Sequence, residues 1–195
     1  MDEKIAVLGA GAWGTTLADL MARKGYRVVL WGRDSEQIAQ MRKIGENERL
    51  LPGVGLCRDL QLSADLGETV DGALYCILAV PCQFLRHVLE RAEPSFLSGS
   101  RVICASKGIE LSSLKPMSAV VAEVLGAKRP EYAMLSGPSF AEEVCGGQPT
   151  AVSLGCENPA VGEELQHVLS TERFRVYTNR DRVGVELGGA IKNVM

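Results

Sequence analysis

Seven short runs of apolar and β-branched residues recur along the chain at the spacing expected of strand–helix units. Most of these runs are apolar at nearly every position, which is typical of strands covered on both faces of a parallel sheet. We therefore expect strands that begin at Ile5, Arg27, Ala73, Arg101, Tyr132, Thr150 and Phe174.

Between the predicted strands, apolar residues recur with the period of a helix. We expect helices over residues 13–24, 35–44, 83–92, 112–125, 139–145 and 159–169. The alternation of strands and helices, joined by right-handed crossovers, predicts an α/β protein with a doubly wound, mostly parallel sheet. The stretch 45–59, which contains Pro52, Gly53 and Gly55, is expected to be a long surface loop.

The composition fits a globular protein and argues against several classes of partner. Of the 195 residues, 46% are hydrophobic and 23% are charged, with a formal net charge of -3. Without a basic face, nucleic acid is not expected as a partner. No segment approaches the roughly 18 apolar residues of a membrane span, and no signal peptide precedes the first strand, so we expect a cytoplasmic protein. The six cysteines form no CxxC pair, which predicts reduced structural thiols and no metal site.

The segment Gly9-Ala10-Gly11-Ala12-Trp13-Gly14 directly follows the first predicted strand and opens the first predicted helix. In this context the spacing GxGxxG predicts a Rossmann-type dinucleotide site. Gly9 permits a tight turn, Gly11 lets the backbone approach a pyrophosphate, and Gly14 allows close packing of helix on strand. The free N–H groups and the dipole of the helix would hold the phosphates. A purely structural glycine turn is the less favoured alternative.

The end of the second predicted strand bears on the choice of cofactor. An Asp or Glu there would accept hydrogen bonds from the adenosine ribose of NAD, but this strand ends in Trp31-Gly32-Arg33-Asp34. Gly32 leaves room where the acid would stand, and Arg33 offers a planar guanidinium suited to a 2′-phosphate. Asp34, with Gln37 three residues on, is typical of the N-cap of the next helix. The sequence therefore favours NADP(H) and leaves NAD(H) possible.

Two further strand ends carry candidate ligand-binding residues, because ligands of open α/β sheets lie beyond the carboxyl ends of the strands. Lys107 follows the strand that begins at Arg101 and could meet a phosphate or a hydroxyl; a solvated surface lysine is the alternative. In the turn after the strand that begins at Tyr132, Ser139 and Glu142 match a capping box. That cap suffices as a structural explanation, although free backbone N–H groups there could also bind a ligand.

The last predicted helix holds a lysine in an apolar setting. In a helix, Val185, Gly188, Gly189 and Lys192 share one face. Two interior glycines each cost on the order of 1 kcal/mol against alanine, which indicates that something approaches this face closely. Desolvation in such a setting lowers the pKa of a lysine and lets it exchange a proton near neutral pH. Catalysis by Lys192 and simple helix packing are both open at this point.

This helix also bears on the domain organisation. It begins near Val183 and stops at Met195 without a Gly or Asn cap or a polar tail. An apolar helix needs a surface to cover, so we expect the chain to be a fragment. Residues 1–182 would form the dinucleotide-binding domain, and residues 183–195 would begin an interdomain helix that leads to an absent helical substrate domain.

Taken together, these segments resemble the NAD(P)-dependent glycerol-3-phosphate dehydrogenases of the bacterial type. The resemblance covers the whole chain and rests on GAGAWG, VVLWGRD, LLPGV, AVP, ASKGIE, LSGPSFAEE, PTAVSL, FRVYTN and VELGGAIKNV in one order. It implies reversible hydride transfer between NAD(P)H and dihydroxyacetone phosphate, which makes sn-glycerol 3-phosphate for phospholipid synthesis. The implied partner is therefore this small-molecule substrate, and a homodimer of the full-length protein is possible.

Carried over by position, the resemblance implies roles for individual residues. Lys192 is similar to the family's catalytic lysine, which takes the hydroxyl proton on oxidation and returns one on reduction. Ala12 stands where many relatives have serine, which removes a hydroxyl near the phosphates but leaves backbone binding intact. The implied cofactor contacts are Trp13, Arg33, Lys107 and Ala141, beside Gly9, Gly11, Ala12 and Gly14 of the glycine motif, and the implied substrate contacts are Lys107, Gly137, Ser139 and Lys192.

Because the family continues past Lys192 into a helical domain with further contacts, we expect this fragment to bind cofactor with little or no turnover. Two other functions stay open. One is a related two-domain reductase of the β-hydroxyacid or ketopantoate type, and the other is a non-catalytic nucleotide-sensing module.

Overall fold

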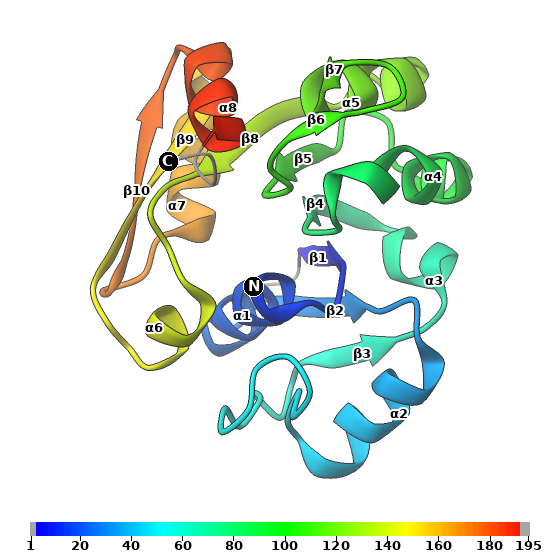
Figure 1. The fold of residues 1–195 in the computed structure, drawn as a ribbon, viewed down its shortest axis with the longest axis vertical. Coiled ribbons are helices and arrows are strands. Elements are labelled where there is room, and N and C mark those ends of the chain that lie inside the picture. Colours follow the sequence, from blue (N-terminus) through cyan, green and yellow to red (C-terminus); the bar gives the residue numbers. More distant parts are fainter. Residues whose placement is uncertain (1–2, 192–195) are drawn as a thin grey trace.

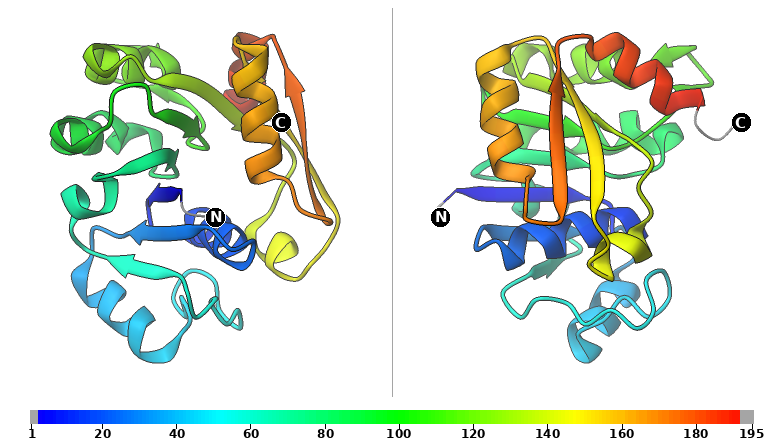
Figure 2. Two further views of the ribbon diagram at one scale, coloured as in Figure 1. Left: turned by 180° about the vertical axis from the view of Figure 1, so that it is seen from behind. Right: turned by 90° about the vertical axis from the view of Figure 1, so that its left-hand side faces the viewer.

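The computed structural model describes residues 3–191. They form a mostly parallel sheet of eight strands in the order β10-β9-β8-β5-β4-β1-β2-β3, with helices on both faces (Figures 1 and 2). The strands of this sheet are β1 (Lys4–Leu8), β2 (Arg27–Trp31), β3 (Gln61–Ser63), β4 (Ala73–Leu78), β5 (Arg101–Cys104), β8 (Glu131–Ser136), β9 (Thr150–Cys156) and β10 (Phe174–Asn179). A separate hairpin pairs β6 (Ile109–Glu110) with β7 (Lys115–Pro116).

The helices divide into two layers, one on each face of the sheet. One layer holds α1 (Ala12–Arg23), α2 (Ser35–Ile44), α6 (Ala141–Cys145) and α7 (Pro159–Leu169). The other holds α3 (Leu66–Val70), α4 (Cys82–Ala92), α5 (Met117–Leu125) and α8 (Arg182–Ile191). Two 3-10 turns, Glu93–Ser95 and Gly126–Lys128, follow α4 and α5. Helices α2 and α3 pack on opposite faces of the sheet, and after this change of face β4 pairs with β1 on the side opposite β2. The connections that follow β1 and β4 therefore lead to opposite faces, through α1 and α4. Such a switch point is where open α/β sheets bind ligands.

Burial on both faces explains the nearly continuous apolar sequence of the central strands. In β1, Ile5 and Val7 belong to the core cluster on the α1 side, whereas Ala6 and Leu8 belong to the cluster on the α4 side. All four side chains are fully buried. A polar side chain at any of these positions would lose its hydration without gaining a partner, which costs free energy on either face.

All seven predicted strands are confirmed, but one pairing is not parallel. Strand β9 runs antiparallel to β8, because the connection between them forms the short α6, which packs against α1 and does not carry the chain back across the sheet. A parallel return needs such a crossover. Strand β10 then pairs parallel to β9, so the last two strands both run against the rest of the sheet.

Four short elements, β3, α3, β6 and β7, were not predicted from the apolar pattern. The helix expected over residues 112–125 begins only at Met117, because residues 109–116 form the hairpin of β6 and β7. Strand β3 and helix α3 span three and five residues, too few for a hydrophobic period to stand out. Within residues 3–191, no helix combines the length and the apolar character that crossing a membrane requires.

Candidate functional site

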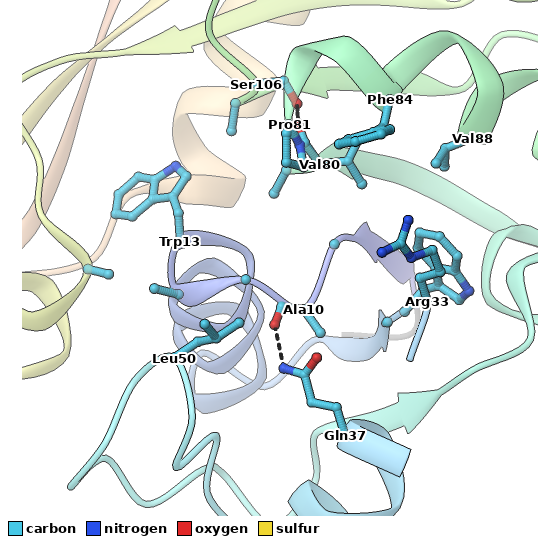
Figure 3. A pocket seen from close by; sticks show the side chains of 18 of the residues that line it. Ala10, Trp13, Arg33, Gln37, Leu50, Val80, Pro81, Phe84, Val88 and Ser106 are labelled. Atoms are coloured by element: carbon cyan, nitrogen blue, oxygen red, sulfur yellow. Dashed lines mark hydrogen bonds between the residues drawn. The ribbon is translucent and has the colours of Figure 1, made fainter. Parts of the chain in front are cut away.

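A cleft of about 650 Å³ opens at the carboxyl ends of the central strands. Its floor is the turn between β1 and α1, and its opposite wall is the start of α4 with the segment after β4 (Figure 3). The loop between α2 and β3 and the segment before α6 close its sides. The lining residues include Gly9, Gly11, Ala12, Trp13, Arg33, Gln37, Arg49, Leu50, Pro81, Phe84, Lys107, Ser139 and Ala141.

The three glycines of the motif act on the structure in different ways. Gly9 has a φ of +122°, and a Cβ there would lie 2.7 Å from the carbonyl oxygen of Ala79. At Gly14 a Cβ would lie 1.9 Å from the carbonyl oxygen of Gly9, so helix and turn touch backbone to backbone. A Cβ at Gly11, by contrast, would meet no protein atom within 4 Å. Two of the glycines are thus required by packing, and the third leaves the cleft open at the first turn of α1.

That first turn of α1 offers free hydrogen-bond donors. The first four N–H groups of a helix have no partner within it, and they mark its positive dipole end. Gly11 is the N-cap, with no side-chain cap on these donors. The neighbouring Trp13 carries a buried indole nitrogen, Nε1, which has no hydrogen-bond partner within residues 3–191. This end of the cleft is therefore suited to an anionic group.

The end of β2 presents an arginine to the cleft. The exposed guanidinium of Arg33 lies 6.0 Å from the centre of the Phe84 ring on α4, close enough for a cation–π contact. Asp34 caps α2 as predicted, because its carboxylate accepts hydrogen bonds from the N–H groups of Glu36 and Gln37. Its second oxygen lies 3.6 Å from the guanidinium of Arg49, which comes from the loop after α2. Two guanidinium groups therefore line this end of the cleft.

Gly32 was expected to leave room where an acidic side chain would stand, and this expectation is wrong. A Cβ at this position would lie 2.7 Å from Cδ1 of Ile38 and 2.9 Å from Cβ of Ala10. Packing of α2 against the glycine-rich turn therefore excludes a side chain at residue 32, whatever binds in the cleft.

Lys107 lines the cleft and also lies close to the end of α8. Its ammonium lies 3.4 Å from the carbonyl oxygen of Gly137. A Cβ at Gly189 would lie 2.7 Å from Oγ of Ser136 and 3.6 Å from Cγ of Lys107. The close approach expected of the helical glycines is thus found at Gly189, whereas Gly188 has open space beside it. Lys192, the candidate catalytic residue, lies outside the described residues.

The turn before α6 differs from the predicted capping box. Helix α6 begins at Ala141 after Phe140, and no side chain caps it. Ser139 instead lies within a tight turn, where its N–H donates to the carbonyl oxygen of Gly137 at 3.0 Å. Ser139 and Ala141 face the main cleft. Gly137, with a φ of +153°, lines a smaller pocket of about 320 Å³ beside Gly188.

Residues 4–162 match the family described as NAD-dependent glycerol-3-phosphate dehydrogenase N-terminus. The chain belongs to this family. The glycerol-3-phosphate dehydrogenase (NAD(P)+) of Solidesulfovibrio magneticus is 47% identical over 98% of the chain, and that of Carboxydothermus hydrogenoformans is also 47% identical over 98%.

Solved glycerol-3-phosphate dehydrogenases have the same fold. The enzyme from Coxiella burnetii superposes with a TM-score of 0.93 at 38% identity, over 99% of this chain and 58% of its own. The enzyme from Saccharomyces cerevisiae superposes with a TM-score of 0.88 at 26% identity, over 100% of this chain and 61% of its own. The chain spans 58% of the length of the Solidesulfovibrio relative and 57% of the Carboxydothermus one.

Helix α8 is attached to the sheet by a buried carboxylate that no motif in the sequence indicated. Glu186 is 3% exposed and accepts hydrogen bonds from the N–H and the hydroxyl of Ser118, at 2.8 and 2.6 Å, and from the hydroxyl of Tyr132 at 3.2 Å. Arg182, one turn earlier in α8, lies 3.3 Å from it. Burial, and with it the nearby Cys104 and Glu186, raises the pKa of Tyr132 well above its usual range. The signal that the sequence offered was Glu186 itself, an acidic residue within the largely apolar helix α8.

The cleft also contains residues that no motif indicated. Arg49 and Phe84 line it beside Arg33, yet neither residue belongs to a sequence motif that would indicate a binding role. Asn47, in the same loop as Arg49, is 1% exposed and hydrogen-bonded to the glycine-rich turn. Their positions depend on how the loop after α2 folds against the β1–α1 turn.

Proposed function

We propose that the cleft binds NAD(P)(H), with the pyrophosphate at the first turn of α1. The observation that carries this proposal is the free space beside Gly11, in front of N–H groups that have no partner in the helix. The buried indole nitrogen of Trp13 supports it, because this donor has no acceptor among residues 3–191 and such a donor costs free energy. Gly9, Ala12 and Gly14 shape the same turn, and Ala141 lies across the cleft from it.

We propose that NADP(H) is preferred, with NAD(H) accepted less well. Arg33 and Arg49 provide two cations at the end of β2, where the adenosine ribose lies in Rossmann domains. Asp34 is engaged with the N–H groups of α2, so its carboxylate is less available to the ribose hydroxyls that NAD presents. A 2′-phosphate would meet guanidinium groups suited to it.

We propose that the full-length protein interconverts dihydroxyacetone phosphate and sn-glycerol 3-phosphate. The bound nicotinamide supplies or accepts a hydride. Lys107, Gly137 and Ser139 would hold the substrate, with the ammonium of Lys107 stabilising its oxygen atoms or phosphate by charge. Lys192 would exchange the proton of the substrate hydroxyl. The close packing of Gly189 against Ser136 and Lys107 supports this arrangement, because it brings α8 to the side of the cleft where Lys107 lies.

Residues 1–182 would then form the cofactor-binding domain, with the helix from residue 183 leading toward the substrate domain. Val183, Leu187 and Ile191 are exposed on α8 at a spacing that puts them on one face, which is in keeping with a helix that packs against further structure. A cytoplasmic location and a homodimer of the full-length protein stay predictions.

The test is an assay of NADPH and NADH oxidation by the full-length gene product, with dihydroxyacetone phosphate as the acceptor. We expect turnover with this substrate and little or none from the 195-residue chain, which should still bind NADPH. Turnover with 2-keto acids but not with dihydroxyacetone phosphate would point to a β-hydroxyacid-type reductase. Cofactor binding without turnover on either substrate would point to a sensing module.

A further inference from the structure

The carbonyl oxygen of Ala10, in the middle of the glycine-rich turn, is held by two side-chain amides from other parts of the chain. Nε2 of Gln37, in α2, donates to it at 3.0 Å, a contact visible in Figure 3. Nδ2 of Asn47, in the loop after α2, donates to it at 3.1 Å. One carbonyl group thus receives donors from two elements that lie 27 and 37 residues further along the chain.

The two amides form a closed network. The other hydrogen on Nδ2 of Asn47 goes to Oγ1 of Thr15 at 2.8 Å, and Oδ1 of Asn47 accepts from Nε2 of Gln37 at 3.2 Å. All four amide hydrogens therefore have acceptors. Asn47 is 1% exposed, so a misplaced amide there would be costly. Gln37 was expected to complete a capping box at Asp34, but its side chain is turned to Ala10.

This network fixes the direction of the neighbouring peptide group. In a trans peptide the C=O of Ala10 and the N–H of Gly11 point in opposite directions within one plane. Holding the oxygen on the side of α2 therefore turns the Gly11 N–H away from α2. This peptide joins Ala10 to Gly11, and on its glycine side no Cβ restricts rotation, so an outside clamp is the means of holding it in one orientation.

Asn47 also organises the loop that reaches the cleft. Its backbone carbonyl oxygen accepts hydrogen bonds from the N–H groups of Leu50 and Leu51, at 3.1 and 2.8 Å. This tight turn carries Arg49 and Leu50 to the cleft. The side chain of Asn47 therefore holds the glycine-rich turn, while its backbone carbonyl holds the loop that forms the neighbouring side of the cleft.

We propose that Asn47 and Gln37 are positioning residues for the cofactor's pyrophosphate: their amides hold the Ala10 carbonyl so that the first turn of α1 is preorganised before a dinucleotide binds. The proposal rests on the proposed cofactor function of the cleft. Preorganised donors bind more tightly because less ordering is needed at the moment of binding. Neither residue has to touch the pyrophosphate for this effect.

The test compares two glutamines on the same helix. Gln37→Met removes the donor to Ala10 and keeps a side chain of similar length. Gln40→Met is the matched control, since Gln40 is exposed and its amide donates to Glu48 at 3.1 Å, away from the turn. Asn47→Leu removes the second donor without adding charge. The dissociation constants for NADPH, NADH and ADP-ribose are measured by quenching of tryptophan fluorescence, at a temperature where each variant is folded.

We expect Gln37→Met to weaken all three ligands by the same factor, on the order of fivefold, and Asn47→Leu to weaken them about tenfold or more, since the first removes two hydrogen bonds of the network and the second removes three. Gln40→Met should leave all three unchanged. NMR order parameters of the Gly11 and Ala12 amides in the free protein should fall in Gln37→Met and not in Gln40→Met. That readout is specific to the turn and does not follow from a general loss of stability.

Three outcomes would overturn the proposal. Unchanged affinities in a folded Gln37→Met variant would leave the network with a structural role only. A loss confined to NADPH would assign Gln37 to the 2′-phosphate end of the cleft. Failure of the unaltered chain to bind any of the three ligands would instead overturn the proposed cofactor function itself. If Asn47→Leu does not fold, the pair of glutamine variants decides the question alone.

Discussion

The glycine-rich turn after β1 and the helix α8 both meet the carboxyl edge of the sheet, but opposite kinds of contact hold them there. The turn is packed backbone against backbone, with Gly14 directly on the carbonyl of Gly9. Helix α8 is attached by a charged side chain, because Glu186 reaches Ser118 and Tyr132 on other elements. Added atoms are therefore excluded at Gly9 and Gly14 of the turn, whereas α8 depends on a carboxylate whose removal would leave buried donors without an acceptor.

The difference follows from what each region has to offer. A ligand-facing turn must expose backbone N–H groups, so its own side chains are small or missing at the glycines, and close backbone packing with two amides from α2 and the following loop holds it. Helix α8 has a largely apolar sequence with Val183, Leu187 and Ile191 exposed, so few of its apolar side chains secure it to the sheet. A buried, fully hydrogen-bonded carboxylate supplies the register that this packing lacks.

The largest effect is expected from Gly14→Ala in the turn. The new methyl group would lie 1.9 Å from a backbone oxygen, so the free energy of unfolding should fall by about 4 kcal/mol or more, as severe overpacking predicts. Gly11→Ala is the control, because no protein atom lies within 4 Å of its Cβ position; it should keep stability and lose dinucleotide affinity. Urea unfolding measures the first effect and ligand titration the second. Equal stability of the two variants would contradict the packing argument.

A smaller loss is expected at α8 from Glu186→Leu. Removing the carboxylate takes the acceptor from the N–H and the hydroxyl of Ser118 and from the hydroxyl of Tyr132, which should cost about 3 kcal/mol of unfolding free energy. The matched control is Glu157→Gln, because Glu157 pairs with the same Arg182 but its side chain is 69% exposed; its effect should stay within about 0.5 kcal/mol. If both variants lose the same stability, burial of the carboxylate is not what anchors the helix.

A third prediction concerns ligand affinity at the end of β2, where neither stability argument applies. Arg33→Ala should weaken NADPH binding by roughly tenfold to a hundredfold, the usual worth of hydrogen bonds to a charged group, and leave NADH binding nearly unchanged. Arg42→Ala serves as control, since the Arg42 guanidinium donates to the Leu62 carbonyl outside the cleft. Titration of each variant with both cofactors gives the two ratios. An equal loss for NADPH and NADH would exclude a 2′-phosphate role for Arg33.

The smallest effect is a pH dependence of stability, and it is expected at the α8 attachment because Tyr132 donates to Glu186 there. The raised pKa of Tyr132 in the folded protein means that its protonated hydroxyl stabilises the fold. This contribution is fully present below the unfolded pKa of about 10 and is lost as the pH rises above it, by at most about 1.4 kcal/mol per pH unit. Tyr132→Phe should therefore flatten the fall of unfolding free energy above pH 10, as measured by urea titrations at several pH values. An unchanged slope would mean that Tyr132 titrates normally in the fold.

Much of the cofactor region could be predicted because its determinants are local. The apolar runs gave all seven long strands, and the GxGxxG spacing after the first run placed the turn correctly. The N-cap at Asp34 was also correct, since it depends on atoms only two and three residues away. The predicted cap at Ser139 was wrong for a tertiary reason: Gly137 packs against Val152 of β9, and the tight turn there delays the helix to Ala141.

The sequence by itself determined the alternating layers, the glycine-rich turn and the cation at Arg33, because steric limits and hydrophobic period act between near neighbours. Only the tertiary structure decided that the side chain of Gln37 donates to Ala10 and that Asn47 is buried beside the same carbonyl. It also decided that Glu186 accepts a hydrogen bond from Ser118, 68 residues away in the sequence. Those contacts depend on where buried polar groups find partners. The need to satisfy them is general, but the partner is chosen by the packing of the whole chain.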